Sequence, residues 1–363
     1  MEAIVVFFIK ERSMNNITLT GIDLAKLVFE VRSENHTGRL VKRATVGRNK
    51  LLSTISQLPK GSEVVMEACG SAHYWGRQFQ ECGLKVKLIP PQHVVPFRKS
   101  QKNDKNDAEA ICEAARRPSM LFIAPKSAEL LTLQALHRVR ERLVKSQTAL
   151  VNQTRGLLAE EGIIIAQGAA SFKKYVVQAL QDKEPLSVGF FTLQSLWSEF
   201  CAQEERIKEF TDKITATAKD TPAAQRLMQE RGVGPIIATA VVAHVGDPRY
   251  YKNGRQFAAS LGLVPKQFSS GGKTTLGSIT KNGNGYLRKL LVHGARTVVA
   301  HTLRREKTVP TTDPTNLWIL TLAKRRTRNC VAVALANKMA RRIWAILAGK
   351  QPMATPQPLP LAA

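Results

Sequence analysis

The sequence predicts an α/β domain over residues 14–126, a long helical segment over 127–220 and a mostly α-helical domain over 221–350. Strand and helix patterns alternate through the first part, which is typical of a domain built on a mixed sheet. Glycine and proline are sparse in the second part, where apolar residues recur at helical spacing. With 363 residues, the chain is long enough to bury more than one hydrophobic core.

In the first part, apolar runs bounded by turn residues predict several strands and two helices. The expected strands are Ile17–Ile22, Leu27–Arg32, Leu40–Val46, Glu63–Met66 and Val86–Ile89, and the expected helices are Leu51–Leu58 and Ala72–Cys82. Residues 1–13 contain a short apolar run without a basic start or a cleavage site, so they make a poor signal peptide. They are interpreted as an upstream extension or a dispensable tail.

The second part is most simply two long antiparallel helices, with a less regular stretch over 163–187 between them. Their pattern favours a coiled coil and self-association as a dimer or tetramer, although helical repeats alone cannot count subunits. The third part contains a Gly-Val-Gly turn, Gly232–Gly234, between two helical patterns, which is the form of a helix-hairpin-helix. Backbone amides at such a turn can hold a DNA phosphate, but many tight turns carry glycine for steric reasons alone.

The charge balance points to a polyanionic partner. The chain has 54 Lys and Arg against 28 Asp and Glu, a formal net charge of +26, and such an excess favours nucleic acid. An anionic membrane surface is the weaker candidate, because we find no long apolar span and no lipidation motif. Basic helical patterns over 322–329 and 336–347 are expected to contribute a backbone-binding face, whereas the proline-rich residues 351–363 are expected to be disordered.

The cysteines fit a reducing, cytoplasmic location. The sequence has five of them, and they are scattered without a CxxC pair or a nearby Cys/His cluster. This spacing argues against a zinc site and against a disulfide framework.

Four acidic residues form a candidate metal site. Asp104 and Asp107 lie three positions apart at an expected helix start, so both can face one point, while Asp23 and Glu67 follow expected strands. If those strands are neighbours, the carboxylates meet and need a cation, for which Mg²⁺ is the natural choice. We expect two Mg²⁺ ions, with Mn²⁺ able to substitute. The alternative is a well-capped, solvated helix start with a turn residue and a surface carboxylate.

Basic residues beside these carboxylates are expected to bind a nucleic-acid backbone. They are Arg98, Lys99, Lys102 and Lys105.

A second candidate region, Gly262–Arg288, is dense in glycine, serine, threonine and basic residues. The residues SSGGKTTLGS predict a flexible loop whose donors could line a phosphate, although they do not match a Walker loop. The alternative is an ordinary surface loop. The residues expected to contact phosphate here are Lys273, Lys281, Arg288 and Lys289.

Three motifs in the first part closely resemble the DEDD motif of the insertion sequence 110 family of transposases: GIDLAK (Gly21–Lys26), MEACG (Met66–Gly70) and KNDKNDAEA (Lys102–Ala110). Residues Leu261–Arg296 are similar to the family's second hallmark, in the form of the 1111 subgroup. The resemblance implies an RNase H-like domain similar to the Holliday-junction resolvase RuvC, with Asp23, Glu67, Asp104 and Asp107 as metal ligands. It also implies that Ser270 is the nucleophile, and Ser269 is the alternative by one position.

The resemblance implies a DNA recombinase that cuts and rejoins strands at element ends and target through a phosphoserine link from Ser270. It further implies a structured guide RNA as a partner, and a prokaryotic protein of the cytoplasm that is associated with the nucleoid. Two alternatives stay open. One is a metal-dependent junction-resolving nuclease in which water attacks, and the other is a non-catalytic nucleic-acid scaffold or RNA chaperone.

Overall fold

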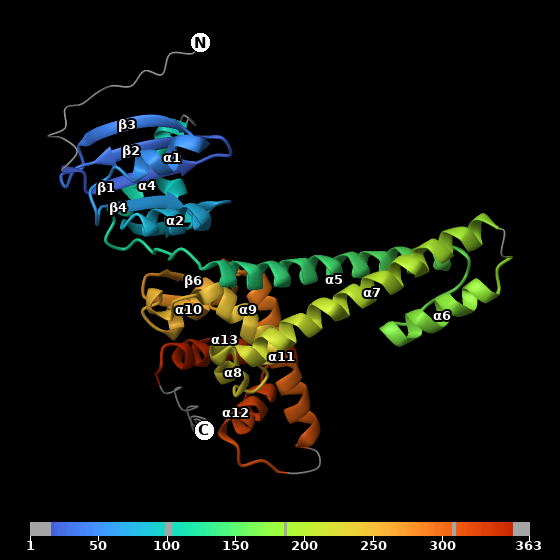
Figure 1. Cartoon of the computed structure of the whole chain (residues 1–363). Coiled ribbons are helices and arrows are strands. Elements are labelled where there is room, and N and C mark those ends of the chain that lie inside the picture. Colours follow the sequence, from blue (N-terminus) through green and yellow to red (C-terminus); the bar gives the residue numbers. More distant parts are fainter. Residues whose placement is uncertain (1–15, 99–103, 185–186, 307–309, 351–363) are drawn as a thin grey trace. The chain divides into compact units, whose positions relative to one another are not determined.

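The computed structural model describes residues 16–98, 104–184, 187–306 and 310–350, with the backbone alone at 104 and 105. The chain divides into two compact units, Met1–Glu129 and Leu130–Ala363, and each has its own hydrophobic core (Figure 1). Several sequence predictions lie outside the described residues: the extension over 1–13, the tail over 351–363, Lys99 and Lys102.

The first unit is built on a five-stranded sheet in the order β3-β2-β1-β4-β5. Strands β1, β2 and β3 pair antiparallel in sequence, whereas β4 pairs parallel to both β1 and β5. This arrangement confirms the predicted mixed α/β sheet. The strand bounds are β1 (Leu19–Leu24), β2 (Val28–Glu34), β3 (Leu40–Gly47), β4 (Glu63–Glu67) and β5 (Lys85–Ile89).

Helices cover both faces of this sheet. Because side chains alternate along each strand, successive residues of a strand belong to different cores. Val64 and Met66 of β4 belong to a core that includes residues of α1 (Arg48–Ile55) and α2 (Ala72–Glu81). Val65, between them, belongs to a second core with residues of α4 (Asp104–Ala115). The predicted helices of the first unit, including the one that begins at Asp104, are therefore confirmed. Between β5 and α4 lie two short helices, α3 (Pro91–Val94) and η2 (Val95–Phe97).

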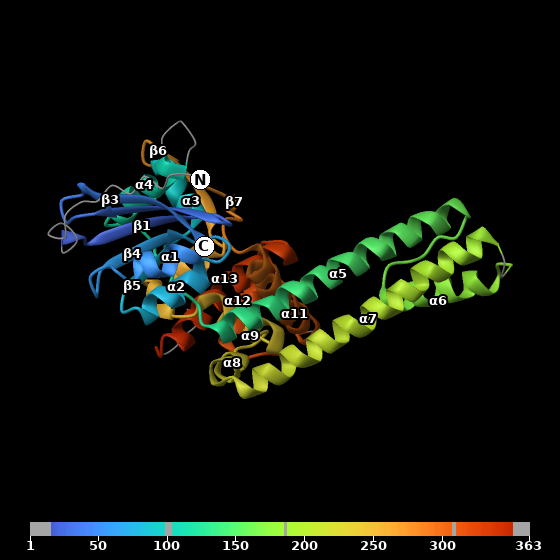
Figure 2. The same cartoon turned by 45° about the horizontal axis from the view of Figure 1, so that its top comes forward.

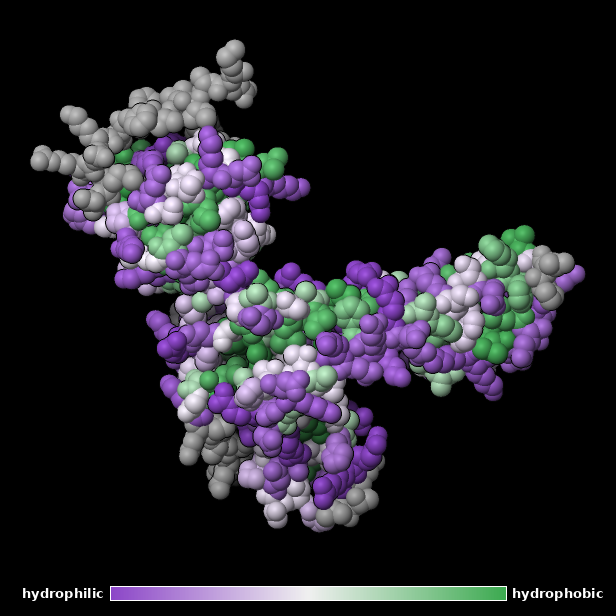
Figure 3. All heavy atoms as spheres, in the orientation of Figure 1, coloured by the Kyte–Doolittle hydropathy of each residue, from purple (hydrophilic) through white to green (hydrophobic). Residues whose placement is uncertain are grey.

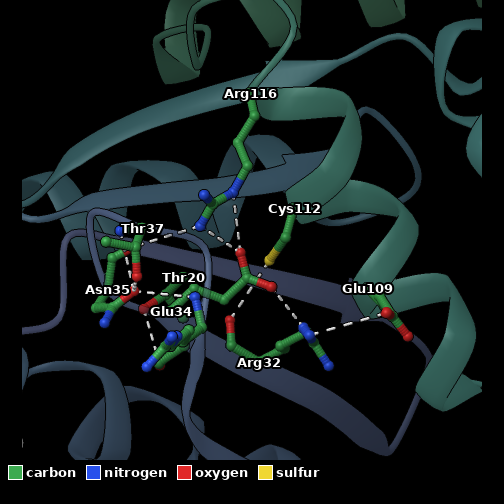
Figure 4. A network of polar contacts seen from close by, with 10 residues as sticks. Thr20, Arg32, Glu34, Asn35, Thr37, Glu109, Cys112 and Arg116 are labelled. Carbon is green, nitrogen blue, oxygen red and sulfur yellow. Dashed lines mark hydrogen bonds and ion pairs between the residues drawn. The ribbon is translucent and has the colours of Figure 1, made fainter.

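A buried ion pair fixes the end of α4 to strand β2. The carboxylate of Glu34 is 4% exposed and lies 2.7 Å from Arg32 Nε and 2.6 Å from Arg116 Nη2 (Figure 4). Two guanidinium groups can satisfy a buried carboxylate that would otherwise be costly. Burial, together with the charge of Glu34, raises the pKa of the nearby Cys112 thiol to about 12. Cys112 is therefore an inert packing residue of this interface.

The second unit is mostly α-helical, as predicted. Its helices are α5 (Ala128–Glu160), α6 (Ala169–Gln181), α7 (Val188–Asp220), α8 (Pro222–Met228), α9 (Pro235–Val245), η3 (Pro248–Tyr250), α10 (Gly254–Ser260), α11 (Gly285–Arg305), α12 (Pro314–Ala323) and α13 (Arg328–Leu347). Side-chain caps mark several helix starts: Asn284 Oδ1, for example, accepts from the amide of Leu287 at 3.1 Å. Most of these helices share one core, to which α13 contributes the largest set of residues.

The long helices α5 and α7 run antiparallel beside one another in both views of the chain (Figures 1 and 2), which confirms this part of the prediction. Arg140 of α5 donates to Thr211 of α7 at 2.7 Å, and a separate small core joins both helices to α6. The stretch predicted as irregular thus contains a helix. Pairing as a coiled coil stays a prediction.

The predicted helix over 322–329 is wrong. Helix α12 ends at Ala323, the chain turns through residues 324–327, and Thr327 caps the start of α13. The Thr327 hydroxyl accepts a hydrogen bond from the backbone amide of Cys330, which stabilises the start of a new helix. The basic residues between Ala323 and Thr327 therefore lie in a turn between two helices.

Candidate functional site

Asp23 and Glu67 lie side by side at one edge of the sheet. The parallel pairing of β1 with β4 sets Ile22 opposite Met66, so that the next residues are the two acids. The condition stated from the sequence, that these two strands are neighbours, is therefore met. The thiol of Cys69 lies close enough to both carboxylates to feel their charge. Burial raises its pKa most, and the negative charges of Glu67 and Asp23 raise it further.

Asp107 joins this group from helix α4. Arg98 Nη2 lies 2.9 Å from Glu67 Oε2, and Arg98 Nε lies 3.2 Å from Asp107 Oδ1. The two carboxylate side chains are only 14% and 11% exposed, whereas that of Arg98 is 33% exposed. One guanidinium therefore links the acid at the end of β4 to an acid on α4. Such bridging is expected where carboxylates crowd, since a cation offsets their mutual repulsion.

Glycine at position 21 allows α4 to come this close to the sheet. A Cβ atom at Gly21 would lie 2.9 Å from the carbonyl oxygen of Ala108, which is nearer than real Cβ atoms approach a backbone. Because Ala108 directly follows Asp107, the same close approach positions the helical carboxylate. The motif GIDLAK thus supplies both an acid and the space that a second acid needs.

Asp23, Glu67 and Asp107 offer carboxylate oxygens, the donor atoms that hard divalent ions prefer. The guanidinium of Arg98 contacts two of these acids, Glu67 and Asp107. Among the side chains that the structure describes, no group of three His, Cys, Asp or Glu is arranged to hold a metal ion. The side chains of Asp104 and Lys105 lie outside the described residues. Binding of a metal ion by Asp23, Glu67, Asp104 and Asp107 therefore stays a prediction.

The serine-bearing segment is a β-hairpin, and the prediction of a flexible loop is wrong. Strands β6 (Pro265–Ser270) and β7 (Lys273–Ile279) pair antiparallel, with Ser270 opposite Lys273. Gly271 and Gly272 form the turn at φ values of +54° and +79°. A two-residue turn with positive φ at both positions matches the twist of a hairpin, and glycine adopts it without strain.

The two candidate serines lie on opposite faces of this hairpin, because side chains alternate along a strand. Ser269 is held on one face, where its hydroxyl lies 2.8 Å from Gln267 Nε2 and 3.4 Å from Thr274 Oγ1. The Ser270 hydroxyl makes no hydrogen bond to any residue that the structure describes, and the residue is exposed. Both serines are exposed, and they differ in that the Ser269 hydroxyl has hydrogen-bond partners among the described residues whereas the Ser270 hydroxyl has none.

The base of the hairpin is fixed tightly to the helical core. Arg288 Nη1 donates to the carbonyl oxygens of Leu261 at 2.9 Å and Asn282 at 3.1 Å. At Gly262 and Gly283 a Cβ atom would overlap backbone atoms of the opposing segment, so the chain can cross there only with glycine. Arg288 therefore has a structural contact in addition to its predicted role at phosphate.

The other basic candidates are distributed around the hairpin. Lys289 forms an ion pair with Glu141 at 2.9 Å, whereas Lys273 and Lys281 are exposed and pair with no acid in the described part of the chain. Contact with nucleic acid stays a prediction for these three residues, for Arg288 and for Arg98.

The glycine turn between α8 and α9 packs against α11. Gly232 has a φ of +79°, and a Cβ atom there would lie 2.9 Å from the carbonyl oxygen of Gly294. This contact supports the steric explanation for the Gly-Val-Gly sequence. A role as a helix-hairpin-helix that holds phosphate stays a prediction.

Comparisons with known proteins agree on the family. A family model described as "Transposase IS116/IS110/IS902 family" matches residues 224–309, and a model of DEDD transposases of the IS110 type matches residues 20–162. A probable family 20 transposase from Pseudomonas aeruginosa is 45% identical over 92% of this chain and 97% of its own length. The chain belongs to the IS110 family of transposases.

Further transposases of similar length support this assignment. The transposase for insertion sequence element IS1111A from Coxiella burnetii is 42% identical, over 94% of this chain and 93% of its own. The transposase for IS1328 from Yersinia enterocolitica is 38% identical, over 92% and 97% respectively. The resemblance to the IS110 family, in its 1111 form, is therefore confirmed. As a transposase, the chain acts on DNA, and no described helix has the length and apolar character of a membrane span.

The candidate residues lie within the two ranges that the family models match. Asp23, Glu67, Asp104 and Asp107 fall within the DEDD match, and Ser270 falls within the other. Sequence reasoning overlooked two features of the acidic site: the bridge that Arg98 makes and the proximity of Cys69 to two carboxylates. The position of Cys69, two residues after Glu67 in MEACG, is a signal that could have revealed the second.

Proposed function

We propose that this transposase cuts and rejoins DNA strands at element ends and target through a covalent bond between DNA and Ser270. Asp23, Glu67, Asp104 and Asp107 bind divalent cations in this proposal, with two Mg²⁺ ions or Mn²⁺ in their place. The observation that carries it is the grouping of acids at one sheet edge, where Glu67 and Asp107 share the guanidinium of Arg98. The sheet order β3-β2-β1-β4-β5 supports the RNase H-like fold that the family resemblance implies.

The proposed chemistry is a transesterification. The Oγ atom of Ser270 forms a bond to phosphorus, the bond from phosphorus to one deoxyribose oxygen breaks, and that sugar leaves as a hydroxyl. The energy of the phosphodiester is kept in the phosphoserine, so a second sugar hydroxyl can rejoin the strand and release the serine. A bound Mg²⁺ supplies Lewis-acid stabilisation of the charge that develops on the phosphoryl oxygens.

The serine needs a base from outside its own hairpin. Residues 265–279 contain no acid and no histidine, and a serine hydroxyl is a weak nucleophile unless a base takes its proton. The group that takes the proton therefore lies outside residues 265–279. Lys273 pairs with Ser270 at the turn and is exposed, which supports a role for it in binding the attacked phosphate.

The proposal includes a structured guide RNA and a homo-oligomer. The net charge of +26 supports a second polyanion beside DNA. Exposed apolar side chains support self-association at the far end of the α5–α7 arm, where Figure 3 shows hydrophobic residues at the surface. Ile164, Val188 and Phe191 are 74%, 81% and 74% exposed there. With DNA as substrate, the protein is assigned to the prokaryotic cytoplasm, at the nucleoid.

Covalent trapping tests this function. The gene is expressed in cells together with its native flanking DNA, which supplies the element ends and any RNA transcribed from them. Cells are lysed in denaturant, and DNA that remains bound to the protein is quantified. We expect an adduct with the natural chain and none with Ser270→Ala.

Ser269→Ala is the matched control, because it removes the neighbouring hydroxyl on the opposite face of the same strand. It should retain most of the adduct. Cleaved DNA without any adduct would favour the nuclease that uses water, and loss of the adduct in Ser269→Ala alone would move the nucleophile by one position.

A further inference from the structure

The aromatic side chain of Phe268 is exposed to solvent near the proposed nucleophile. Phe268 of β6 is 64% exposed, although phenylalanine is among the residues most often found inside proteins. It stands two positions before Ser270 in the strand. The described cores do not include it.

Phe268 and Ser270 share one face of the hairpin. Side chains two apart point the same way, and directly opposed residues of an antiparallel pair share a face. The register sets Phe268 opposite Thr275 and Ser270 opposite Lys273, which places all four on this face. The other face carries Ser269, which contacts Gln267 and Thr274 on the same face, together with Leu276.

The space beneath the ring is left free by glycine. A Cβ atom at Gly277 would lie 3.4 Å from Phe268 Cε2, so the ring lies along a backbone that carries no side chain there. The ring is thus supported from the hairpin while most of its surface stays accessible. A flat, supported and exposed aromatic ring is the form of a stacking platform for nucleic-acid bases.

The spacing of Phe268 and Ser270 suits a DNA strand. Two residues of a β-strand span about 6.7 Å, whereas neighbouring bases of one DNA strand lie about 3.4 Å apart. The ring therefore lies within two base steps of a phosphate held at Ser270, which brings a base beside that phosphate within its reach. Lys273, on the same face, supplies the positive charge that holds the phosphate.

We propose that Phe268 is a positioning residue that stacks on a DNA base next to the phosphate attacked by Ser270. The stacked base fixes the strand on the hairpin, so that the phosphorus atom lies in front of the Ser270 hydroxyl. This inference rests on the proposed function in one respect, the identity of Ser270 as nucleophile. Binding of a base to the ring does not itself require the covalent step.

A fluorescent base tests the stacking without chemistry. The full chain with Ser270→Ala is mixed with a synthetic four-way DNA junction that carries 2-aminopurine next to the branch point. Stacking on Phe268 should change the 2-aminopurine emission. Adding Phe268→Ala should abolish that change and weaken binding by about fivefold to about a hundredfold, the range for one stacked base. Phe268→Trp should keep both, because indole stacks as well.

Leu276→Ala in the same Ser270→Ala background is the matched control. Leu276 is 61% exposed in the same hairpin but lies on the opposite face, so its loss should alter binding by less than about twofold. The inference is overturned if Ser270→Ala alone leaves the emission unchanged, if Phe268→Ala has no effect, or if Leu276→Ala has an equal effect. An emission change without any covalent adduct in the natural chain would refute the serine mechanism and leave the stacking role standing.

Discussion

Arg98 Nη2 lies 2.9 Å from Glu67 Oε2, so a basic side chain occupies a carboxylate that the proposed chemistry assigns to a metal ion. The same guanidinium contacts Asp107 through Nε at 3.2 Å. If these acids bind a divalent cation as proposed, a cation between Glu67 and Asp107 would have to displace Arg98. Under that proposal the arginine competes with the metal for the two carboxylates.

Arg98→Ala should therefore bind Mg²⁺ more tightly and be less stable without it. Removing the guanidinium leaves the repulsion between two carboxylates unscreened, which should lower the free energy of unfolding by about 1 kcal/mol. Added Mg²⁺ should restore that loss and raise the melting temperature of the variant more than that of the natural chain. Calorimetric titration and thermal unfolding measure the two effects.

Arg342→Ala is the control for this prediction. Arg342 pairs with Glu230 at 2.8 Å and its side chain is 34% exposed, close to the 33% of Arg98, but it belongs to the second unit and not to the acidic site. Its removal should leave Mg²⁺ affinity unchanged. Equal or weaker Mg²⁺ binding by Arg98→Ala would show that the arginine does not compete with a metal.

The acidic residues should be required for recombination. Glu67→Ala and Asp104→Ala each remove a proposed ligand, and we expect recombination in cells to fall at least about a hundredfold. Glu63→Ala is the matched control, and it should leave recombination unchanged. Glu63 lies in the same strand as Glu67 but at the opposite end of that strand, where it pairs with Lys87. Activity that survives both ligand substitutions would support the non-catalytic scaffold instead.

The sheet and its acidic edge could be predicted because burial leaves a pattern in the sequence. In β4, Val64 to Met66 are fully buried between helices on both faces, and the polar Glu67 marks where burial ends. Parallel neighbouring strands that end together bring such residues to one end of the sheet, so the proximity of Asp23 to Glu67 could be predicted on the condition that β1 and β4 are neighbours, which the structure meets.

The hairpin and the arginine bridge left no comparable signal. Every residue of β6 is exposed, so no core imposes an alternation of apolar and polar residues on that strand. Its serines, glycines and lysines therefore predict a loop as readily as a hairpin. At Arg98 the sequence shows only a basic residue that precedes an acidic helix. Whether its side chain contacts nucleic acid or the nearby carboxylates depends on how the chain turns through η2, which the sequence does not show.

Gly21→Ala should displace helix α4 and with it Asp107. The added methyl meets the carbonyl of Ala108 at 2.9 Å, and overpacking of this kind costs about 1–3 kcal/mol. We expect lower thermal stability and loss of the covalent adduct, although no acid is changed. Gly47→Ala is the control, since a Cβ there meets nothing within 4 Å and φ is −69°. If both variants match the natural chain, α4 does not depend on close approach at Gly21.

His137 should make the second unit lose stability as the pH falls. The ring is 3% exposed and lies between Tyr286 Oη at 3.0 Å from Nδ1 and Thr239 Oγ1 at 3.0 Å from Nε2. The Thr239 hydroxyl donates to the carbonyl of Pro235, so it accepts from Nε2–H, and Nδ1 accepts from Tyr286. A neutral ring satisfies this arrangement, whereas a protonated ring would set a donor on Nδ1 against the tyrosine.

Burial, reinforced by the charge of Arg140, lowers the pKa of His137 from 6.5 to about 4. Between these values the unfolded chain takes up a proton that the folded chain does not. The free energy of unfolding therefore falls by up to about 1.4 kcal/mol per pH unit below pH 6.5 and is unaffected by this group above it. Denaturant unfolding measures this free energy at each pH for the natural chain and for His137→Gln. Between pH 6.5 and 4 the free energy of unfolding should fall less steeply in His137→Gln than in the natural chain. His36→Gln, a change at an exposed position, is the control and should keep the natural slope. A slope that His137→Gln leaves unchanged would assign the acid sensitivity to other groups.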